Sequence, residues 1–307
     1  MRVLVFGAGV IGQIYAGRLV AAGHSVQLVA RGSHAEQLGR EGITLKQGKQ
    51  ISGPVFPAIV DADGQAQPVE VALVAIRRDQ FEGALPQLAR LRADTVASLI
   101  NLPTGLDELA EAVGPARFIP AFPGVAGKRL ADGTIEFLEL AQQPTTIGSS
   151  PSSLEHVRRV NALLETAGLR AAVANDMDAW LKTHAIFIAA FESALAARGG
   201  DARALGVDRA AVRELVAAVR QALDVLNGRG TQTAPTALRV IFQRMPLWFS
   251  TRYWARQLVG PLGTLGLAPH AVATRYTELP TLQREVHSII GAGTAPRWEA
   301  LFAGAGD

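Results

Sequence analysis

Residues 3–32, VLVFGAGVIGQIYAGRLVAAGHSVQLVARG, set out a strand, a tight turn, a helix and a second strand. Val3–Phe6 is a short apolar run of the kind that is buried on both faces of a parallel sheet. Helical spacing follows and ends near Gly23, and His24–Ala30 is again typical of a strand. This order and length predict one βαβ unit of about 30 residues.

The turn between that strand and the helix has the spacing G-x-G-x-x-G, in Gly7, Ala8, Gly9, Val10, Ile11 and Gly12. The first glycine permits the tight turn, the second lets a phosphate approach the backbone, and the third lets helix and strand pack closely. The helix N-terminus adds unpaired N–H groups and a partial positive charge. We therefore predict that these six residues bind the pyrophosphate of a dinucleotide, the alternative being a glycine-rich turn without a ligand.

The second strand ends at Arg31, where sites for NAD have an acidic residue that binds the ribose hydroxyls. A guanidinium suits a 2′-phosphate and gives nothing special to a bare hydroxyl. Arg77 and Arg78 follow another apolar strand, Val71–Ile76, and we expect Arg77 to contact the cofactor from the same edge. We therefore favour NADP(H) over NAD, the alternative for Arg31 being an ordinary surface arginine.

The rest of the chain changes pattern once. Up to about residue 172 we expect alternating strands and helices: strands at Val69–Ile76, Thr95–Ile100 and Arg117–Phe122, helices at Phe81–Leu91, Asp107–Val113 and Leu154–Ala167, and a hairpin or edge pair of Gly133–Leu140 with Gln143–Ile147. Beyond it we expect only helices, at Asp178–Arg198, Asp208–Asn227, Pro235–Phe249 and His270–Ile290. The prediction is an α/β protein in which a Rossmann-type doubly wound domain, 1–172, precedes an all-α domain, 173–307.

Composition narrows the class of protein. The 307 residues are 49% hydrophobic and 19% charged, which indicates a globular chain, and the absence of cysteine excludes disulfides, thiolate nucleophiles and iron–sulfur clusters. A net charge of +3 gives no reason to expect nucleic acid. The histidines show no metal-ligand spacing, so we expect no metal. No uncharged apolar stretch of about 18 residues is present, and we expect a cytoplasmic protein, with a signal peptide at Met1–Ala22 as the disfavoured alternative.

A hydride-transferring cofactor leaves the protein to supply a proton. The best candidate is Lys182, in the most apolar predicted helix, where it shares a face with Ile186, Ala189 and Ser193. The alternative is a lysine near a helix start that extends its amine to water. His184 is the rival donor, although a single histidine in such a helix is more often structural.

Three places in the sequence resemble the ketopantoate reductase (2-dehydropantoate 2-reductase) family: residues 7–32, Ser98–Asn101 with Gly105-Leu106, and Asp178–Lys182. The resemblance implies that Lys182 is the general acid, that Asn101 serves both catalysis and cofactor binding, and that Glu278, in Thr277-Glu278-Leu279, holds a substrate hydroxyl. It also implies an NADPH-dependent reduction of 2-dehydropantoate to pantoate in pantothenate biosynthesis.

The sequence departs from the family where a polar substrate would be held. Members usually have Asn one turn after the lysine, where this chain has Ile186, and their Asn-Gly-Leu-Gly type motif is here Asn101-Leu102-Pro103-Thr104-Gly105. Hydrogen-bonding capacity is therefore lost. The leading hypothesis is reduction of a small 2-oxo acid or ketone. The alternatives are a dehydrogenase for a bulkier, less polar substrate and a non-catalytic NADP-binding sensor on the same fold.

One further segment stands out. Residues 239–257 interleave aromatic side chains with arginines, and Pro246 interrupts the segment as a single helix. Core or cleft packing is the favoured interpretation; a homodimer interface is second, and contact with a membrane surface is the least favoured.

Overall fold

The computed structural model describes residues 1–61, 67–149 and 153–302. The chain divides into two compact units. The first comprises Met1–Asn101 and Gly105–Met177, and the second comprises Leu102–Thr104 and the chain from Asp178 onward.

The first unit is built on an eight-stranded sheet of order β12-β11-β8-β7-β6-β1-β2-β5. Neighbouring strands are parallel except β11 and β8, which are antiparallel. The central strands read as continuous apolar runs because both of their faces are covered. The strands span β1 (Arg2–Phe6), β2 (Ser25–Val29), β5 (Ala58–Val60), β6 (Val69–Val74), β7 (Ala93–Ser98), β8 (Phe118–Phe122), β11 (Thr145–Gly148) and β12 (Ala171–Ala174).

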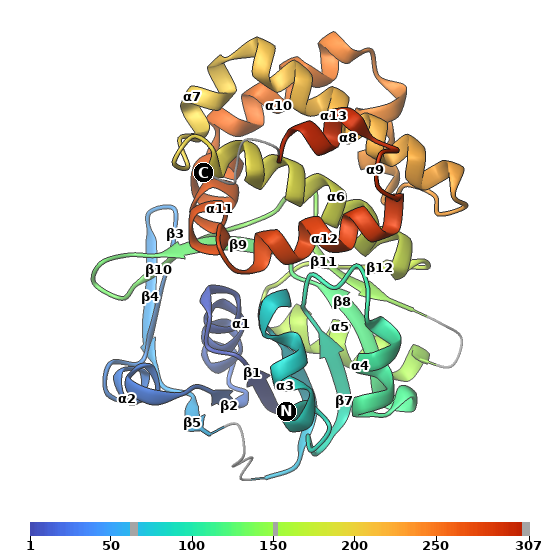
Figure 1. Cartoon of the computed structure of the whole chain (residues 1–307). Coiled ribbons are helices and arrows are strands. Elements are labelled where there is room, and N and C mark those ends of the chain that lie inside the picture. The colour runs from blue at the N-terminus through green and yellow to red at the C-terminus, as the bar shows by residue number, and fades with distance from the viewer. Residues whose placement is uncertain (62–66, 150–152, 303–307) are drawn as a thin grey trace. The chain divides into compact units, whose positions relative to one another are not determined.

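The helices of this unit cover both faces of the sheet (Figure 1). The chain passes from β1 to β2 in one direction along the sheet and from β6 to β7 to β8 in the other. Right-handed crossovers therefore put α1 on one face and α3 and α4 on the opposite face. This is the doubly wound arrangement that the sequence predicts. The helices are α1 (Val10–Ala21), α2 (Gly32–Glu41), α3 (Phe81–Leu88), α4 (Leu106–Val113) and α5 (Leu154–Thr166), with short turns η1 (Arg78–Gln80) and η2 (Pro115–Arg117).

A second, four-stranded sheet was not predicted. It consists of β4 (Gln50–Val55), β3 (Ile43–Gln47), β10 (Ile135–Glu139) and β9 (Val125–Arg129), in that order, and it packs against α1. The predicted pairing of Gly133–Leu140 with Gln143–Ile147 is wrong, because β10 pairs with β9 and β3 whereas β11 belongs to the larger sheet. Ile135 and Phe137 explain the choice, since both are buried in the apolar core of this unit.

The second unit is helical throughout its described residues. Its apolar core contains a cluster of aromatic rings, Phe187, Phe191, Phe242 and Trp254, whose centroids lie 4.6–6.4 Å apart. Its helices are α6 (Met177–Ala196), α7 (Ala202–Val207), α8 (Arg209–Gly228), α9 (Thr236–Arg239), α10 (Leu247–Val259), α11 (Ala268–Thr274), α12 (Glu278–Ile290) and α13 (Pro296–Ala300), with π-type turns η4 (Val240–Arg244) and η5 (Leu262–Leu267) (Figure 1).

Two helices expected to be continuous are divided. The predicted Pro235–Phe249 helix splits into α9, η4 and the start of α10, because Pro246 has an extended backbone and precedes α10. The predicted His270–Ile290 helix splits into α11 and α12 at Thr277, whose backbone is not helical. In this region Phe242 and Trp254 are buried, as core packing requires, whereas Trp248 is 66% exposed.

The boundary proposed at residue 172 falls inside β12. That strand pairs with β11 along Thr145–Gly148, so the first unit continues to Met177. Within the described residues, no helix has the length and apolar character needed to cross a membrane.

Gly12 offers a direct test of how tightly α1 packs on β1. A Cβ at position 12 would overlap the carbonyl oxygen of Gly7, so Gly12→Ala should lower the free energy of unfolding by about 2–3 kcal/mol. The matched control is Gly39→Ala in α2, where a Cβ meets nothing within 4 Å and should stabilise by about 0.5–1 kcal/mol. Denaturant unfolding of both variants measures the two changes. Equal stability of the two variants would contradict this packing.

Candidate active site

The glycine-rich turn lies at the point where the strand order of the large sheet reverses, between β1 and β6. Gly7 has φ +116°, and a side chain there would meet the carbonyl oxygen of Ala75, just after β6. Gly9 differs, since a Cβ at this position would meet nothing within 4 Å. α1 begins at Val10 with no acidic residue in its first turn and no side-chain cap. Free amides above an open glycine fit a phosphate group.

Two predicted arginines follow β2 and β6, the two strands that flank β1, at the carboxyl end of the sheet. Arg31 follows β2, is exposed, and donates to the neutral Oε1 of Gln87 at 2.5 Å. Among the described residues no carboxylate oxygen lies within 4 Å of its guanidinium. Arg77 follows β6 and makes two contacts to Asp79, at 2.9 and 3.1 Å. The charge of Arg77 is thus already balanced, and Arg31 is the stronger candidate for an anionic ligand.

Asn101 follows β7, which lies next to β6 in the sheet. Its Oδ1 is buried and has no hydrogen-bond partner in the described part of the chain. A buried acceptor without a donor is costly, so the position suits a ligand that supplies an N–H or O–H. The structure therefore brings the glycine-rich turn, Arg31, Arg77 and Asn101 to one edge of the first unit.

Lys182 lies in the second unit, one turn into α6. Its Nζ donates to Oδ2 of Asp178 at 2.6 Å, and its side chain is 23% exposed. The i,i+4 spacing places the two side chains on one helix face, which the sequence already shows. Ile186, one turn later, is fully buried. The carboxylate fixes the amine while leaving part of it accessible, as a proton donor needs.

Glu278 begins α12 and is almost completely buried. Its Oε2 lies 3.3 Å from Nε2 of His270, whose Nδ1 lies 2.6 Å from Oε1 of Glu192 on α6. Partial burial of the ring disfavours its charged form, yet the two carboxylates outweigh this and raise the pKa of His270 well above its ordinary value. An imidazolium between two carboxylates thus connects α6, α11 and α12.

Sequence reasoning missed His270 and Glu192. The two residues lie far apart in the chain, and the predicted continuous helix over 270–290 concealed the turn that lets His270 and Glu278 meet. Neither residue has a motif around it that would have singled it out. In the described residues no group of three histidine or acidic side chains has an arrangement that could hold a metal ion.

His184 is buried on α6 and stacks on Trp180 with ring centroids 5.0 Å apart. Burial, with a smaller contribution from the charge of His270, lowers the pKa of His184 to about 3. A ring held neutral in the core has a structural role. This agrees with the expectation that His184 is a weaker candidate for the proton donor than Lys182.

The fold and the glycine-rich edge define a Rossmann-type α/β protein with a helical C-terminal unit. Comparison with known proteins identifies the family: residues 3–152 match the profile of ketopantoate reductase PanE/ApbA. The N-terminal part of this chain is therefore a domain of the ketopantoate reductase family, which confirms the resemblance drawn from the sequence.

Individual proteins are similar to this chain in sequence or in fold. A 2-dehydropantoate 2-reductase from Mesorhizobium japonicum is 28% identical over 212 residues, which cover 59% of this chain and only 63% of that relative's length. A 2-dehydropantoate 2-reductase from Geobacter metallireducens has the same fold, with a TM-score of 0.74, 16% identity, and coverage of 98% of this chain and 97% of its own. D-mandelate dehydrogenase, solved with NADH and anilino(oxo)acetate, also has a TM-score of 0.74, at 14% identity and 98% and 96% coverage.

The depressed pKa of His184 predicts how stability depends on pH. The folded state takes up this proton only near pH 3 whereas the unfolded chain does so near 6.5, so protonation favours unfolding and stability falls as the pH falls through this window. The contribution is about 1.4 kcal/mol for each pH unit below 6.5. His184→Phe should remove it while keeping an aromatic ring on Trp180.

Urea unfolding of both proteins between pH 7.5 and 4.5 measures the difference. At pH 7.5 the histidine is neutral in both states, so the two proteins should then differ only through packing. Parallel stability curves down to pH 4.5 would refute a neutral, buried His184.

Proposed function

We propose that the protein reduces the carbonyl of a small 2-oxo acid or ketone to the hydroxy compound with NADPH, as in the reduction of 2-dehydropantoate to pantoate. The observation that carries this proposal is the open glycine-rich turn beside Arg31, which has no carboxylate partner among the described residues, in a ketopantoate reductase domain. Location in the cytoplasm is part of the same proposal.

The preference for NADPH rests on Arg31. The solved D-mandelate dehydrogenase is described with NADH, and a likeness of fold at 14% identity leaves the choice of nicotinamide cofactor open. The residues of this chain favour the phosphorylated form, since Arg31 offers a guanidinium where NAD sites offer a carboxylate.

The bound nicotinamide would supply the hydride to the substrate carbonyl carbon. Lys182 then donates a proton from Nζ to the oxygen on which negative charge develops, and Asp178 holds the amine in position for this transfer. The family resemblance gives Asn101 the role of holding the carbonyl region and Glu278 that of accepting a hydrogen bond from a substrate hydroxyl. The contact to His270 fixes the position of the Glu278 carboxylate.

The second candidate function is reduction of a bulkier, less polar 2-oxo acid. Ile186 favours it, because this fully buried side chain has no hydrogen-bonding group where family members usually have Asn. Anilino(oxo)acetate, with which D-mandelate dehydrogenase was solved, carries an aromatic group of this kind.

NADPH oxidation followed by absorbance tests the proposed function. We expect turnover with 2-dehydropantoate or with one of a panel of bulkier 2-oxo acids such as phenylglyoxylate. Higher kcat/KM for the bulkier acids would select the second candidate. Tight NADPH binding without turnover on any member of the panel would contradict an enzyme and leave the NADP-binding sensor.

Lys182→Ala should lower kcat by about 10²- to 10⁴-fold, because the developing alkoxide loses its proton donor. The Kd for NADPH, measured by fluorescence, should stay unchanged. Lys49→Ala, on an exposed turn, is the matched control and should retain full activity. Activity that survives Lys182→Ala would show that another group donates the proton.

A further inference from the structure

We propose that Arg129 is a second cation for the 2′-phosphate of NADPH, held ready by His34 on the first turn of α2. This inference rests on the proposed use of NADPH and extends it to the four-stranded sheet, which the sequence did not reveal. All of the residues involved belong to the first unit.

The contacts place the guanidinium of Arg129 beside the glycine-rich turn. Nη2 of Arg129, at the end of β9, lies 3.2 Å from Nε2 of His34. The same ring nitrogen lies 3.0 Å from the carbonyl oxygen of Ala8, to which Gln13 also donates at 2.8 Å. The second sheet, packed on α1, thus brings an arginine from late in the domain to the N-terminal turn.

The hydrogen bond between Arg129 and His34 is easily replaced by one from Arg129 to a ligand. One ring nitrogen cannot accept a hydrogen bond from Arg129 and donate one to Ala8 at the same time. When a stronger acceptor draws the guanidinium away, His34 can donate to Ala8 instead, so no polar atom is left unpaired. A bound anion can therefore replace His34 as the hydrogen-bond partner of Arg129 at little cost in free energy.

Arg129 makes no ion pair with any residue that the structure describes. Among the described residues no carboxylate oxygen lies within 4 Å of its guanidinium, and burial lowers the pKa of Arg129. Arg129 is nevertheless exposed, so its charge costs little when unpaired and is accessible to an anion.

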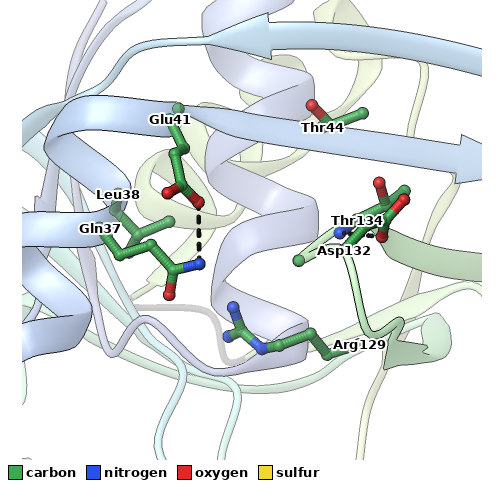
Figure 2. Close-up of a pocket in the computed structure, with 9 residues that line it drawn as sticks. Gln37, Leu38, Glu41, Thr44, Arg129, Asp132 and Thr134 are labelled. Atoms are coloured by element: carbon green, nitrogen blue, oxygen red, sulfur yellow. Dashed lines mark hydrogen bonds between the residues drawn. The ribbon is translucent and has the colours of Figure 1, made fainter.

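The two nearest acidic side chains do not supply that charge. Figure 2 shows Arg129, Glu41 and Asp132 around one pocket, with Glu41 hydrogen-bonded to Gln37. Glu41 also pairs with Arg40 at 2.8 Å, and Asp132 accepts from the backbone N–H of Thr134 at 2.9 Å. The neighbouring Lys128 differs from Arg129, since it lies 3.7 Å from Glu136.

Position along the cofactor indicates which phosphate group Arg129 would meet. The pyrophosphate belongs at the free amides where α1 begins, whereas the adenosine ribose belongs at the end of the second strand. Arg129 touches His34, only three residues beyond Arg31, and Ala8 presents a carbonyl oxygen on this side, which repels an anion. The phosphate on the ribose is the one that fits.

Binding measurements test the inference without turnover. The probes are NADPH and NADH by fluorescence, and 2′,5′-ADP and 5′-AMP by calorimetry. Arg129→Met keeps the aliphatic stem and should raise the Kd for NADPH and 2′,5′-ADP about tenfold or more, while NADH and 5′-AMP change less than about twofold. Arg129→Lys should lose less, and Lys128→Met, the matched control, should leave all four constants unchanged.

Two results would overturn the role of Arg129. An equal loss for NADH and NADPH would place Arg129 on the pyrophosphate, and unchanged constants in a variant with the wild-type Tm would give it no ligand. Failure of the cofactor assignment itself looks different, because wild-type protein would then bind 2′,5′-ADP no more tightly than 5′-AMP, and Arg31→Ala would weaken NADPH and NADH alike.

Discussion

The carbonyl oxygen of Gly7 lies so close to the Cα of Gly12 that no side chain fits between them. This single approach fixes how α1 leaves β1, and it determines where the free amides at the start of α1 point. Because β1 and β6 are neighbours from which the chain departs in opposite directions, the turn lies where no helix covers the sheet edge. The position of the proposed phosphate site in the first unit therefore follows from one backbone contact and from the strand order.

The second unit depends on a different constraint, which is the cost of burying carboxylates. Glu192 and Glu278 are both almost fully buried, and each would be expensive without a partner. His270 compensates both, at 2.6 and 3.3 Å, and thereby joins three helices. The pair of Lys182, the proposed general acid, with the exposed carboxylate of Asp178 shows a second way to fix a charged group on a helical scaffold.

The parts of the fold that follow local rules were predictable from the sequence. The βαβ unit, the alternation over 69–122 and the helical second half all come from hydrophobic periodicity and glycine spacing. The four-stranded sheet was not predictable, because β10 chooses its partners through burial of Ile135 and Phe137 and lies beside β3, about 90 residues away in the chain. The split between α11 and α12 was missed although Pro280, in the first turn of α12, is a local signal of a helix start.

The site residues divide in the same way, into those that local sequence indicates and those that depend on long-range contacts. Gly7–Gly12 and Arg31 could be proposed from local spacing, whereas His34, His270 and Arg129 make their contacts with residues that are distant in sequence. The presence of several arginines at this end of the sheet does not show which of them suit a cofactor. The partners of each arginine within the protein do distinguish them. Arg77 is neutralised by Asp79 and Arg78 by Glu82, whereas Arg31 hydrogen-bonds to Gln87 and Arg129 to His34, with no ion pair to a carboxylate among the described residues. Under the proposed use of NADPH, selectivity for the phosphorylated cofactor would reside in the cations that have no carboxylate partner among the described residues.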